Sequence, residues 1–329
     1  MLINECAEKI TGYSYWTVEG IMPRISDAIL GCSIYLYPSV YDARNGEKSG
    51  GSGFLVGVPS TVKGCGSYIY AVTNYHVVCK EIGNSPVIRI NTVSGQTETI
   101  EYDYTNWYRH PDGDDIAIAP INKELSRYKL NLVSYDLLIT PEIISNKDIG
   151  AGDDVFMVGR FIGYDGKQKN EPTIRFGNLS LTSTVKMRND DLGIEQESFL
   201  IEVRSLSGYS GSPVFVKIQP LAERPGVYDL SLDSHKWLLG VDWGHQPLIV
   251  DVLDKYGKNR IEEKWKVKIN SGVACIVPAW KLAELLNIDE LAKRRKENDG
   301  ELEKRIVEQA ETKVIPQVTL DSKEDNLTT

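Results

Sequence analysis

The segment SLSGYSGSPVFVKI, residues 205–218, joins a turn rich in glycine and serine to a short strand. From Pro213 onward the run PVFVKI is typical of a short β-strand. Gly208 has no Cβ, so the backbone can bend there in ways that other residues resist. The segment therefore predicts a tight turn that leads directly into a strand.

Short β-rich runs of the same kind fill the chain from about Ile29 to Pro278. Glycine, asparagine, aspartate and proline separate them at turn signals such as Asp112-Gly113. Many short strands without intervening amphipathic helices predict antiparallel barrels or a sandwich. Further examples of the runs are CSIYLYPSV (32–40), GFLVGV (53–58), YIYAVT (68–73), VIRINTV (87–93) and DVFMVG (154–159).

The composition changes after Pro278, where leucines recur at helical spacing and the stretch 293–305 is densely charged. We expect solvated helices here, with a break at Gly300 and a polar, frayed end from Pro316. Residues 1–26 show no clear strand period and form an N-terminal extension in this interpretation, with a short helix.

The overall charge excludes several classes of protein. The 329 residues carry 46 acidic and 37 basic side chains, a net charge of −9, which argues against a general nucleic-acid binder. No apolar run is long enough to span a membrane, and the charged N-terminus is unlike a signal peptide. The five cysteines lie far apart without metal-ligand spacing, so we expect reduced thiols, no metal and a cytoplasmic protein.

The turn at 208–212 has the composition of a nucleophile site. A serine hydroxyl is a weak nucleophile unless a base and donors for the developing oxyanion lie beside it. Ser210 is the candidate nucleophile, and the N–H groups of Gly208 and Ser210 are the candidate oxyanion hole. A structural turn between two strands is the alternative. The α/β-hydrolase elbow does not fit, because serine stands at position 212 and a strand follows.

His76 and Asp115 are the candidate base and its orienting acid. His76 follows the strand-like run AVTNY, and Asp115 opens the alternating run IAIAPI. The carboxylate would accept the imidazole Nδ1–H and stabilise the imidazolium. Asp114 is a weaker second choice, because alternation directs it to the opposite side. The order His76, Asp115, Ser210 is that of chymotrypsin and differs from the orders in subtilisin and the α/β-hydrolases.

With these motifs in that order, the chain resembles a trypsin-like (chymotrypsin-fold) serine peptidase of the bacterial HtrA/Deg-related type, without a PDZ domain. GSGFLV (51–56), AVTNYHVV (71–78), DIAIAPI (115–121) and GYSGSPV (208–214) carry the resemblance. It implies an all-β fold of two six-stranded antiparallel barrels with a C-terminal helical extension. Residues 27–150 would form the first barrel, with His76 and Asp115, and residues 151–280 the second, with Ser210. Residues 281–329 would be the charged helical tail.

The resemblance also implies substrate contacts. LLGVDWG (238–244) is similar to the wall of the specificity pocket, which assigns Asp242, Trp243 and Gly244 to the substrate channel. Arg204, about six residues before the serine, would lie at the pocket floor and favour an acidic residue before the scissile bond. Arg204 pointing elsewhere, or pairing with Glu202, is the alternative.

Three departures from the family pattern stand out. The family disulfide beside the histidine is absent. Tyr209 stands where animal digestive members carry Asp, so we expect no activation by cleavage after Arg24. Ser212 replaces a usual glycine, which leaves the oxyanion hole intact.

The expected function is that of a serine endopeptidase, which acts on proteins or peptides through an acyl-enzyme and needs no cofactor. We expect regulation by a partner protein or by the tail, and neither nucleic acid nor membrane as a partner. Free-standing family members also occur in bacterial anti-phage systems. A catalytically inactive peptide-binding module on the same fold, and an esterase with the same triad, are the alternatives.

Overall fold

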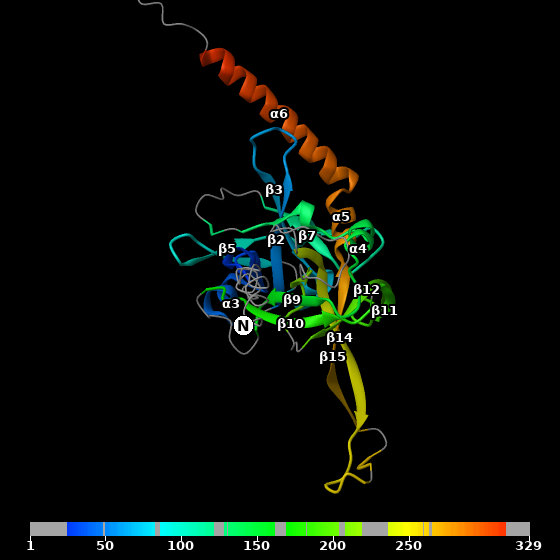
Figure 1. Cartoon of the computed structure of the whole chain (residues 1–329). Coiled ribbons are helices and arrows are strands. Elements are labelled where there is room, and N and C mark those ends of the chain that lie inside the picture. Colours follow the sequence, from blue (N-terminus) through cyan, green and yellow to red (C-terminus); the bar gives the residue numbers. More distant parts are fainter. Residues whose placement is uncertain are drawn as a thin grey trace, which may run out of the picture.

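The computed structural model describes residues 25–48, 50–82, 86–121, 128–129, 131–161, 169–181, 183–203, 208–218, 236–258, 260–262 and 265–313. Two antiparallel β-sheets form the body, and two C-terminal helices follow them (Figure 1). The polar C-terminal end and the N-terminal segment before Ile25 lie outside the described residues.

The first sheet has the strand order β5-β4-β1-β2-β3-β7-β6, and β8 pairs with β2 in parallel. Its central strand β2 is buried along almost its whole length, so both of its faces are covered. The strands are β1 (Ser33–Tyr37), β2 (Gly51–Pro59), β3 (Ser67–Thr73), β4 (Val87–Asn91), β5 (Thr97–Glu101), β6 (Tyr108–Arg109), β7 (Ala117–Pro120) and β8 (Val133–Ser134).

The second sheet has the order β10-β9-β13-β14-β15-β12-β11, and β10 also pairs with β12. That pairing closes six of its strands into a barrel. The strands are β9 (Asp154–Gly159), β10 (Thr173–Leu179), β11 (Val185–Asn189), β12 (Ile194–Val203), β13 (Pro213–Lys217), β14 (Lys236–Asp251) and β15 (Lys266–Pro278). Strands β14 and β15 continue beyond the barrel as a long hairpin (Figure 1).

One apolar core connects the two sheets. Phe54, Val72 and Ile118 of the first sheet belong to the same buried cluster as Phe156 and Phe215 of the second. Burial of a side chain of this size stabilises the folded state by about 1.5–3 kcal/mol, so the two sheets are held together firmly. The all-β prediction with a C-terminal helical extension is confirmed. The first sheet, however, has eight strands rather than six, and only the second is closed by the described pairings.

The helices are short within the body and longer at its C-terminal end. Their bounds are α2 (Asp27–Leu30), α3 (Val40–Asn45), α4 (Pro141–Asn146), α5 (Ala279–Leu286) and α6 (Asp289–Lys313), with a π-helical turn η1 (Val77–Glu81) and 3-10 turns η2 (Tyr104–Asn106) and η3 (Tyr135–Leu137). Among the described helices, none combines the length and the apolar character that a membrane crossing requires. The four cysteines among the described residues are free thiols.

Helix α6 runs through Gly300, so the predicted break there is wrong. Glycine inside a helix costs about 1 kcal/mol relative to alanine, and the preceding residue offsets that cost. Asp299 accepts hydrogen bonds from Ser60 Oγ (2.6 Å), Thr61 Oγ1 (2.6 Å) and Tyr68 OH (2.6 Å). Burial acts to raise the pKa of Asp299, but these hydrogen bonds hold it below its ordinary value. They dock α6 against the β2–β3 hairpin (Figure 1).

Candidate active site

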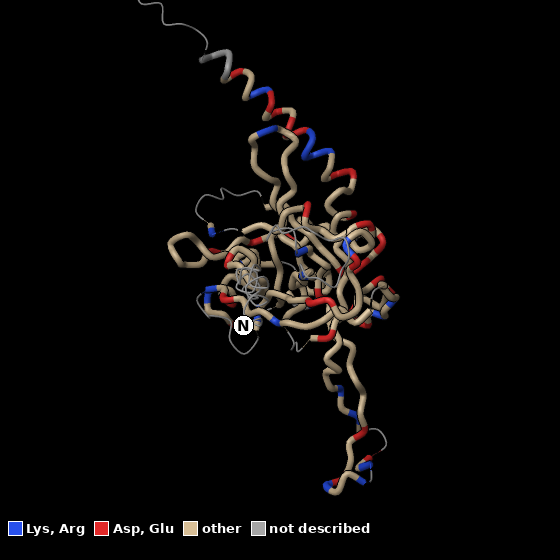
Figure 2. Tube along the Cα trace, in the orientation of Figure 1, with Lys and Arg blue, Asp and Glu red and all other residues tan. Residues whose placement is uncertain are grey.

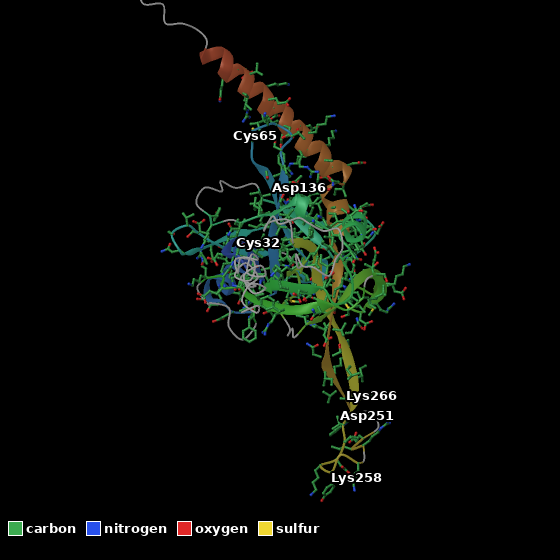
Figure 3. The ribbon with its side chains drawn as sticks, viewed as in Figure 1. Cys32, Cys65, Asp136, Asp251, Lys258 and Lys266 are labelled. Carbon is green, nitrogen blue, oxygen red and sulfur yellow. The ribbon has the colours of Figure 1, made fainter. Side chains whose placement is uncertain are left out.

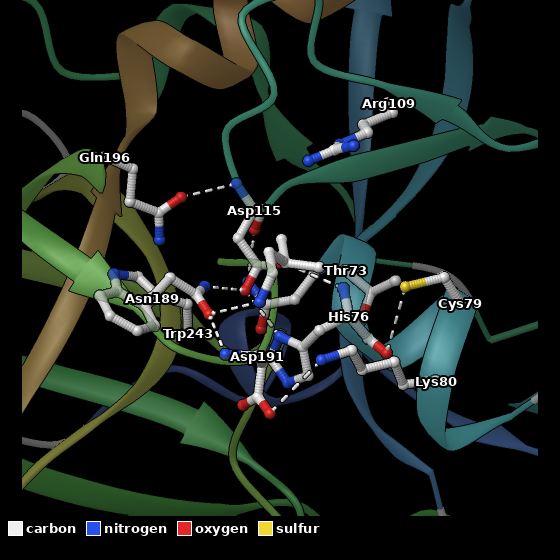
Figure 4. A network of polar contacts seen from close by, with 12 residues as sticks. Thr73, His76, Cys79, Lys80, Arg109, Asp115, Asn189, Asp191, Gln196 and Trp243 are labelled. Atoms are coloured by element: carbon white, nitrogen blue, oxygen red, sulfur yellow. Dashed lines mark hydrogen bonds and ion pairs between the residues drawn. The ribbon is translucent and has the colours of Figure 1, made fainter. Parts of the chain in front are cut away.

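The imidazole of His76 and the carboxylate of Asp115 form a buried pair. His76 lies three residues beyond the end of β3, and Asp115 lies just before β7, the neighbour of β3 in the sheet. Nδ1 of His76 lies 2.6 Å from Oδ2 of Asp115, and the backbone N–H of His76 donates to Oδ1 (2.9 Å). His76 is 4% exposed and Asp115 is fully buried. The carboxylate therefore holds both the backbone and the ring of the histidine (Figure 4).

Three further side chains fix Asp115 in this position. Asn189 Nδ2 donates to Oδ2 of Asp115 (2.9 Å), Gln196 Oε1 accepts from its backbone N–H (2.7 Å), and Asn74 Nδ2 donates to its carbonyl oxygen (2.8 Å). Asn189 and Gln196 belong to β11 and β12, so the second sheet completes the surroundings of an acid from the first (Figure 4). The sequence analysis missed these three residues, because no local pattern marks an amide that lies far away in the chain.

Asp114 belongs to a different cluster. Its Oδ2 lies 3.1 Å from His110 Nδ1 and 3.7 Å from Lys281 Nζ of α5. Burial raises the pKa of Asp114, while the nearby His110 and Lys281 oppose the shift. His110, Asp112 and Asp114 offer ligand atoms within 4.8 Å of one another, but the Lys281 ammonium already lies beside both carboxylates. Of the two adjacent acids, only Asp115 contacts His76.

The turn that carries Ser210 is held against strand β2. The backbone N–H of Ser52 donates to the Ser210 carbonyl oxygen (2.9 Å), and Ser52 Oγ donates to the carbonyl oxygen of Gly208 (3.0 Å). Gly208 and Gly211 have φ angles of +99° and +88°, a region that favours glycine. A Cβ on Gly211 would lie 2.0 Å from the Ser52 carbonyl oxygen, so the close approach of the turn requires glycine there.

The same contacts bring the serine turn and the histidine segment to one end of β2. A Cβ placed on Gly51 would lie 3.2 Å from the Ser210 carbonyl oxygen and 2.9 Å from Cγ1 of Val77, the residue after His76. Ser52 is a contributor to this arrangement that the sequence analysis did not single out.

The amides of Gly208 and Ser210 donate to no backbone carbonyl within the part of the chain that the structure describes, and the same holds for Tyr209 between them. The Gly211 N–H donates to the Asp242 carbonyl oxygen (2.8 Å), and the Ser212 N–H donates to that of Tyr209 (2.8 Å). An oxyanion hole requires N–H donors that are not already used within the turn.

Tyr209 anchors the serine turn in the second sheet. Its ring is fully buried, and its hydroxyl lies 2.5 Å from Thr173 Oγ1 and accepts a hydrogen bond from Arg175 Nε (3.1 Å). The position before the serine is thus filled by an internal contact of the barrel. It offers no carboxylate to a new N-terminal ammonium.

Of the residues assigned to the substrate channel, Asp242 and Trp243 are buried and Gly244 is half-buried. Trp243 Nε1 donates to Ser198 Oγ (3.0 Å). Asp242 is fully buried, and its backbone carbonyl and N–H bond to Gly211 and Ser212 of the serine turn. Both faces of β14 are buried over residues 238–243, and the Asp242 side chain assigned to the substrate channel lies among these buried residues. Arg204 lies outside the described residues.

The Asp242 carboxyl is a buried acid near the histidine. Both of its oxygens lack a hydrogen-bond partner within the described residues. Burial raises the pKa of Asp242 to about 7, although the Gly244 amide and the charge of His76 act in the opposite direction. The folded chain therefore keeps this proton up to about pH 7, while an unfolded chain loses it near its ordinary value of 3.8. Stability must fall as the pH rises through this range.

Replacing Asp242 with Asn is expected to remove that pH dependence, since the amide stays neutral. The variant should match the wild type in free energy of unfolding near pH 4 and exceed it by about 4 kcal/mol at pH 8, at roughly 1.4 kcal/mol for each unit of pKa shift. Urea unfolding of both proteins at the two pH values measures this. The same difference at both pH values would show that Asp242 does not titrate as argued.

The chain is similar to one family of known sequences and to several solved structures. The sequence model of the trypsin-like peptidase domain matches residues 51–218, just over half of the chain. Among solved structures, the inactive form of the Rv3671c protease is similar at 16% identity over 79% of this chain and 89% of that chain, with a TM-score of 0.41. The active form from M. tuberculosis has 16% identity over 79% and 81%, with a TM-score of 0.40.

A search of curated proteins found no match. The matched span 51–218 includes His76, Asp115 and Ser210, the three residues singled out from the sequence. The chain therefore belongs to the family of trypsin-like peptidase domains.

Proposed function

We propose that this peptidase is a serine endopeptidase that hydrolyses proteins or peptides with the triad Ser210, His76 and Asp115. The observation that carries the proposal is the 2.6 Å contact between His76 Nδ1 and the Asp115 carboxylate. This carboxylate is buried and accepts three hydrogen bonds. A carboxylate in this position sets the tautomer, because Nδ1 must carry the proton that it accepts. Nε2 is then left with a lone pair and can act as a general base.

The reaction follows from these roles. Ser210 Oγ attacks the peptide carbonyl carbon while His76 Nε2 takes the hydroxyl proton, and the carbonyl oxygen becomes an oxyanion. The C–N bond breaks as His76 returns the proton to the leaving amine, which leaves an acyl-enzyme ester on Ser210. Water then attacks the ester carbonyl carbon while His76 takes one of its protons. His76 passes this proton to Ser210 Oγ as the ester C–O bond breaks, which releases the carboxylic acid and restores the serine. Asp115 stabilises the imidazolium in both halves.

The N–H groups of Gly208 and Ser210 are the proposed donors to the oxyanion. The support for this assignment is that both amides lack a described backbone acceptor and lie on either side of the buried Tyr209. Removal of a single donor of this kind costs about 2.7–4 kcal/mol of transition-state stabilisation in a studied protease. The tight glycine turn and its bonds to Ser52 preorganise these amides before substrate binds.

Labelling with a fluorophosphonate probe tests the proposal directly. The probe reacts only with a serine that a neighbouring base activates. We expect one phosphonyl group, mapped by mass spectrometry to Ser210 and absent in the Ser210→Ala and His76→Ala variants. A folded wild-type protein that stays unlabelled would favour the alternative, an inactive peptide-binding module on the same fold.

A further inference from the structure

The long β14–β15 hairpin carries an unusual concentration of exposed apolar side chains. We refer to its part beyond the barrel, residues 247–270, as the arm; it projects from the body on the side away from α6 (Figure 1). Of fifteen large hydrophobic side chains exposed in the described residues, eight lie on the arm. They are Leu248, Ile249, Leu253, Tyr256, Ile261, Trp265, Val267 and Ile269, between 42% and 71% exposed.

Four of these eight side chains, Leu248, Trp265, Val267 and Ile269, share one face. In the antiparallel register Leu248 pairs with Ile269 and Val250 with Val267, and the N–H of Val252 donates to the carbonyl oxygen of Trp265. Directly paired residues point to the same side of a ribbon and alternate along each strand. One face of the arm is therefore made of Leu248, Val250, Val252, Trp265, Val267 and Ile269.

The opposite face carries the charged side chains of the two strands beside the apolar Ile249 and Leu253. On it Ile249 pairs with Lys268 and Asp251 with Lys266, and Arg260 makes an ion pair with Asp251 (2.7 Å). Asp251, Lys258 and Lys266 lie along the projecting hairpin in Figure 3. The arm is thus a two-sided ribbon, with one face suited to burial and the other suited to water.

The apolar face has no covering layer among the described residues. β13 pairs with β14 only as far as Val241, and β12 pairs with β15 only over Val273–Ile276. The arm therefore consists of two strands with two open edges. An isolated two-stranded ribbon is only marginally stable in water, and an apolar patch of this kind marks an interaction site.

A protein surface fits the arm better than a lipid bilayer. Insertion of the ribbon would place its open edges in hydrocarbon, where each unpaired backbone group costs several kcal/mol. A protein surface can instead bury the apolar face and form hydrogen bonds with the open backbone edges, so we take a protein as the occupant.

The charge of the chain points to a second copy as that protein. The arm has six basic residues and four acidic ones, a net charge of +2, so the remaining chain carries −11 (−9 minus +2). Figure 2 shows basic residues along the arm and at its tip, and acidic together with basic residues over the body. The body of one chain is therefore electrostatically complementary to the arm of another. A two-fold axis would let each copy give and receive one arm and so close the assembly.

From these observations we propose that the chain forms a dimer in which the apolar face of each arm packs on the acidic body of the second copy. The contact buries the six side chains of the apolar face. It leaves the open edges of the arm for hydrogen bonds with the partner. The proposal does not depend on catalysis by Ser210, so an inactive protein would dimerise in the same way.

Sedimentation velocity of the full chain over a dilution series tests the assembly. We expect a species of twice the 36.8 kDa of one chain. Ile269→Glu and Ile249→Glu form a matched pair, because they make the same substitution on opposite faces of the arm. Ile269→Glu should raise the dimer dissociation constant about 10-fold or more, and Ile249→Glu should leave it almost unchanged. Thermal unfolding checks that both variants are folded.

A charge-reversal variant tests the attraction between the basic arm and the acidic surface of the second copy. Lys255→Glu combined with Lys258→Glu leaves the apolar face intact but reverses two charges of the arm. This change should weaken the dimer and reduce its sensitivity to salt, because fewer opposite charges meet across the interface. A dimer with unchanged affinity and unchanged salt dependence in this variant would contradict the acidic partner surface.

Cross-linking identifies what the arm touches. A carbodiimide joins lysines to carboxylates in direct contact, and a mixture of ¹⁴N- and ¹⁵N-labelled chains separates links between copies from links within one. We expect mixed-isotope links from Lys255 or Lys258 at the tip of the arm to acidic residues outside it, because Lys266 and Lys268 lie on the face turned away from the partner. Four results would overturn the proposal: a monomer at every concentration, links only between two arms, equal effects of the two isoleucine variants, or a monomer that co-sediments with phosphatidylserine vesicles.

Discussion

Ser210→Ala is expected to lower kcat for peptide hydrolysis by a factor on the order of 10⁶, as loss of the nucleophile does in subtilisin. Alanine has no hydroxyl to form the acyl-enzyme, and no other group at the turn can replace it. The fold should be unaffected, since the backbone contacts of Ser210 with Ser52 do not involve its side chain. The rate is measured on the best peptide found in a proteome-derived pool digested by the wild type.

Ser212→Ala is the matched control for this experiment. The two serines stand two residues apart in the same turn, but Ser212 Oγ is buried and has no hydrogen-bond partner among the described residues. It packs beside Gly159, where a Cβ would lie 2.0 Å from it. Removal of the Ser212 hydroxyl should leave kcat within a few-fold of the wild type. Hydrolysis by Ser210→Ala at a rate near that of the wild type would refute the assignment of the nucleophile.

Asp115→Asn should lower kcat about 10⁴-fold, the size of the effect seen when the corresponding acid of a serine protease is changed to the amide. The carboxylate accepts three hydrogen bonds, from the backbone and ring of His76 and from Asn189. Asparagine has one acceptor oxygen and an NH₂ group that donates. If that group faces Nδ1, the imidazole proton moves to Nε2, and His76 can no longer accept the proton of Ser210.

Asp114→Asn is the control for the acid, because Asp114 is adjacent in the sequence but contacts His110 and Lys281 instead of His76. Single-turnover rates of fluorophosphonate labelling measure the activation of Ser210 in both variants without the need for a known substrate. Asp115→Asn should label far more slowly than Asp114→Asn. If both variants label at the same rate, the role of Asp115 as orienting acid is wrong.

Local sequence patterns were sufficient for the all-β class and for the choice of His76, Asp115 and Ser210 as candidates. Alternation of apolar and polar residues reports which strands have a buried face, and it depends only on neighbours in the chain. The glycines at 208 and 211 report a tight turn for the same reason. Both signals are local, so they can be read without knowledge of the tertiary structure.

Contacts between distant segments could not be predicted in this way. Asn189 and Gln196 reach Asp115 across more than 70 positions of the chain, and Ser52 reaches the serine turn across more than 150. Gly300 looked like a helix break, but hydrogen bonds to Asp299 from the β2–β3 hairpin accompany an unbroken helix. Tertiary bonds of this kind outweigh a local propensity of about 1 kcal/mol.

The sequence by itself determined the kinds of residue available for chemistry, their order along the chain and the strands that hold them. Only the tertiary structure decided which acid meets His76, that Asp242 is buried, and that the β14–β15 hairpin leaves the body as an arm with one apolar face. The physical reason is that hydrogen bonding and burial depend on distance in space, whereas a sequence pattern reports only the neighbours along the chain.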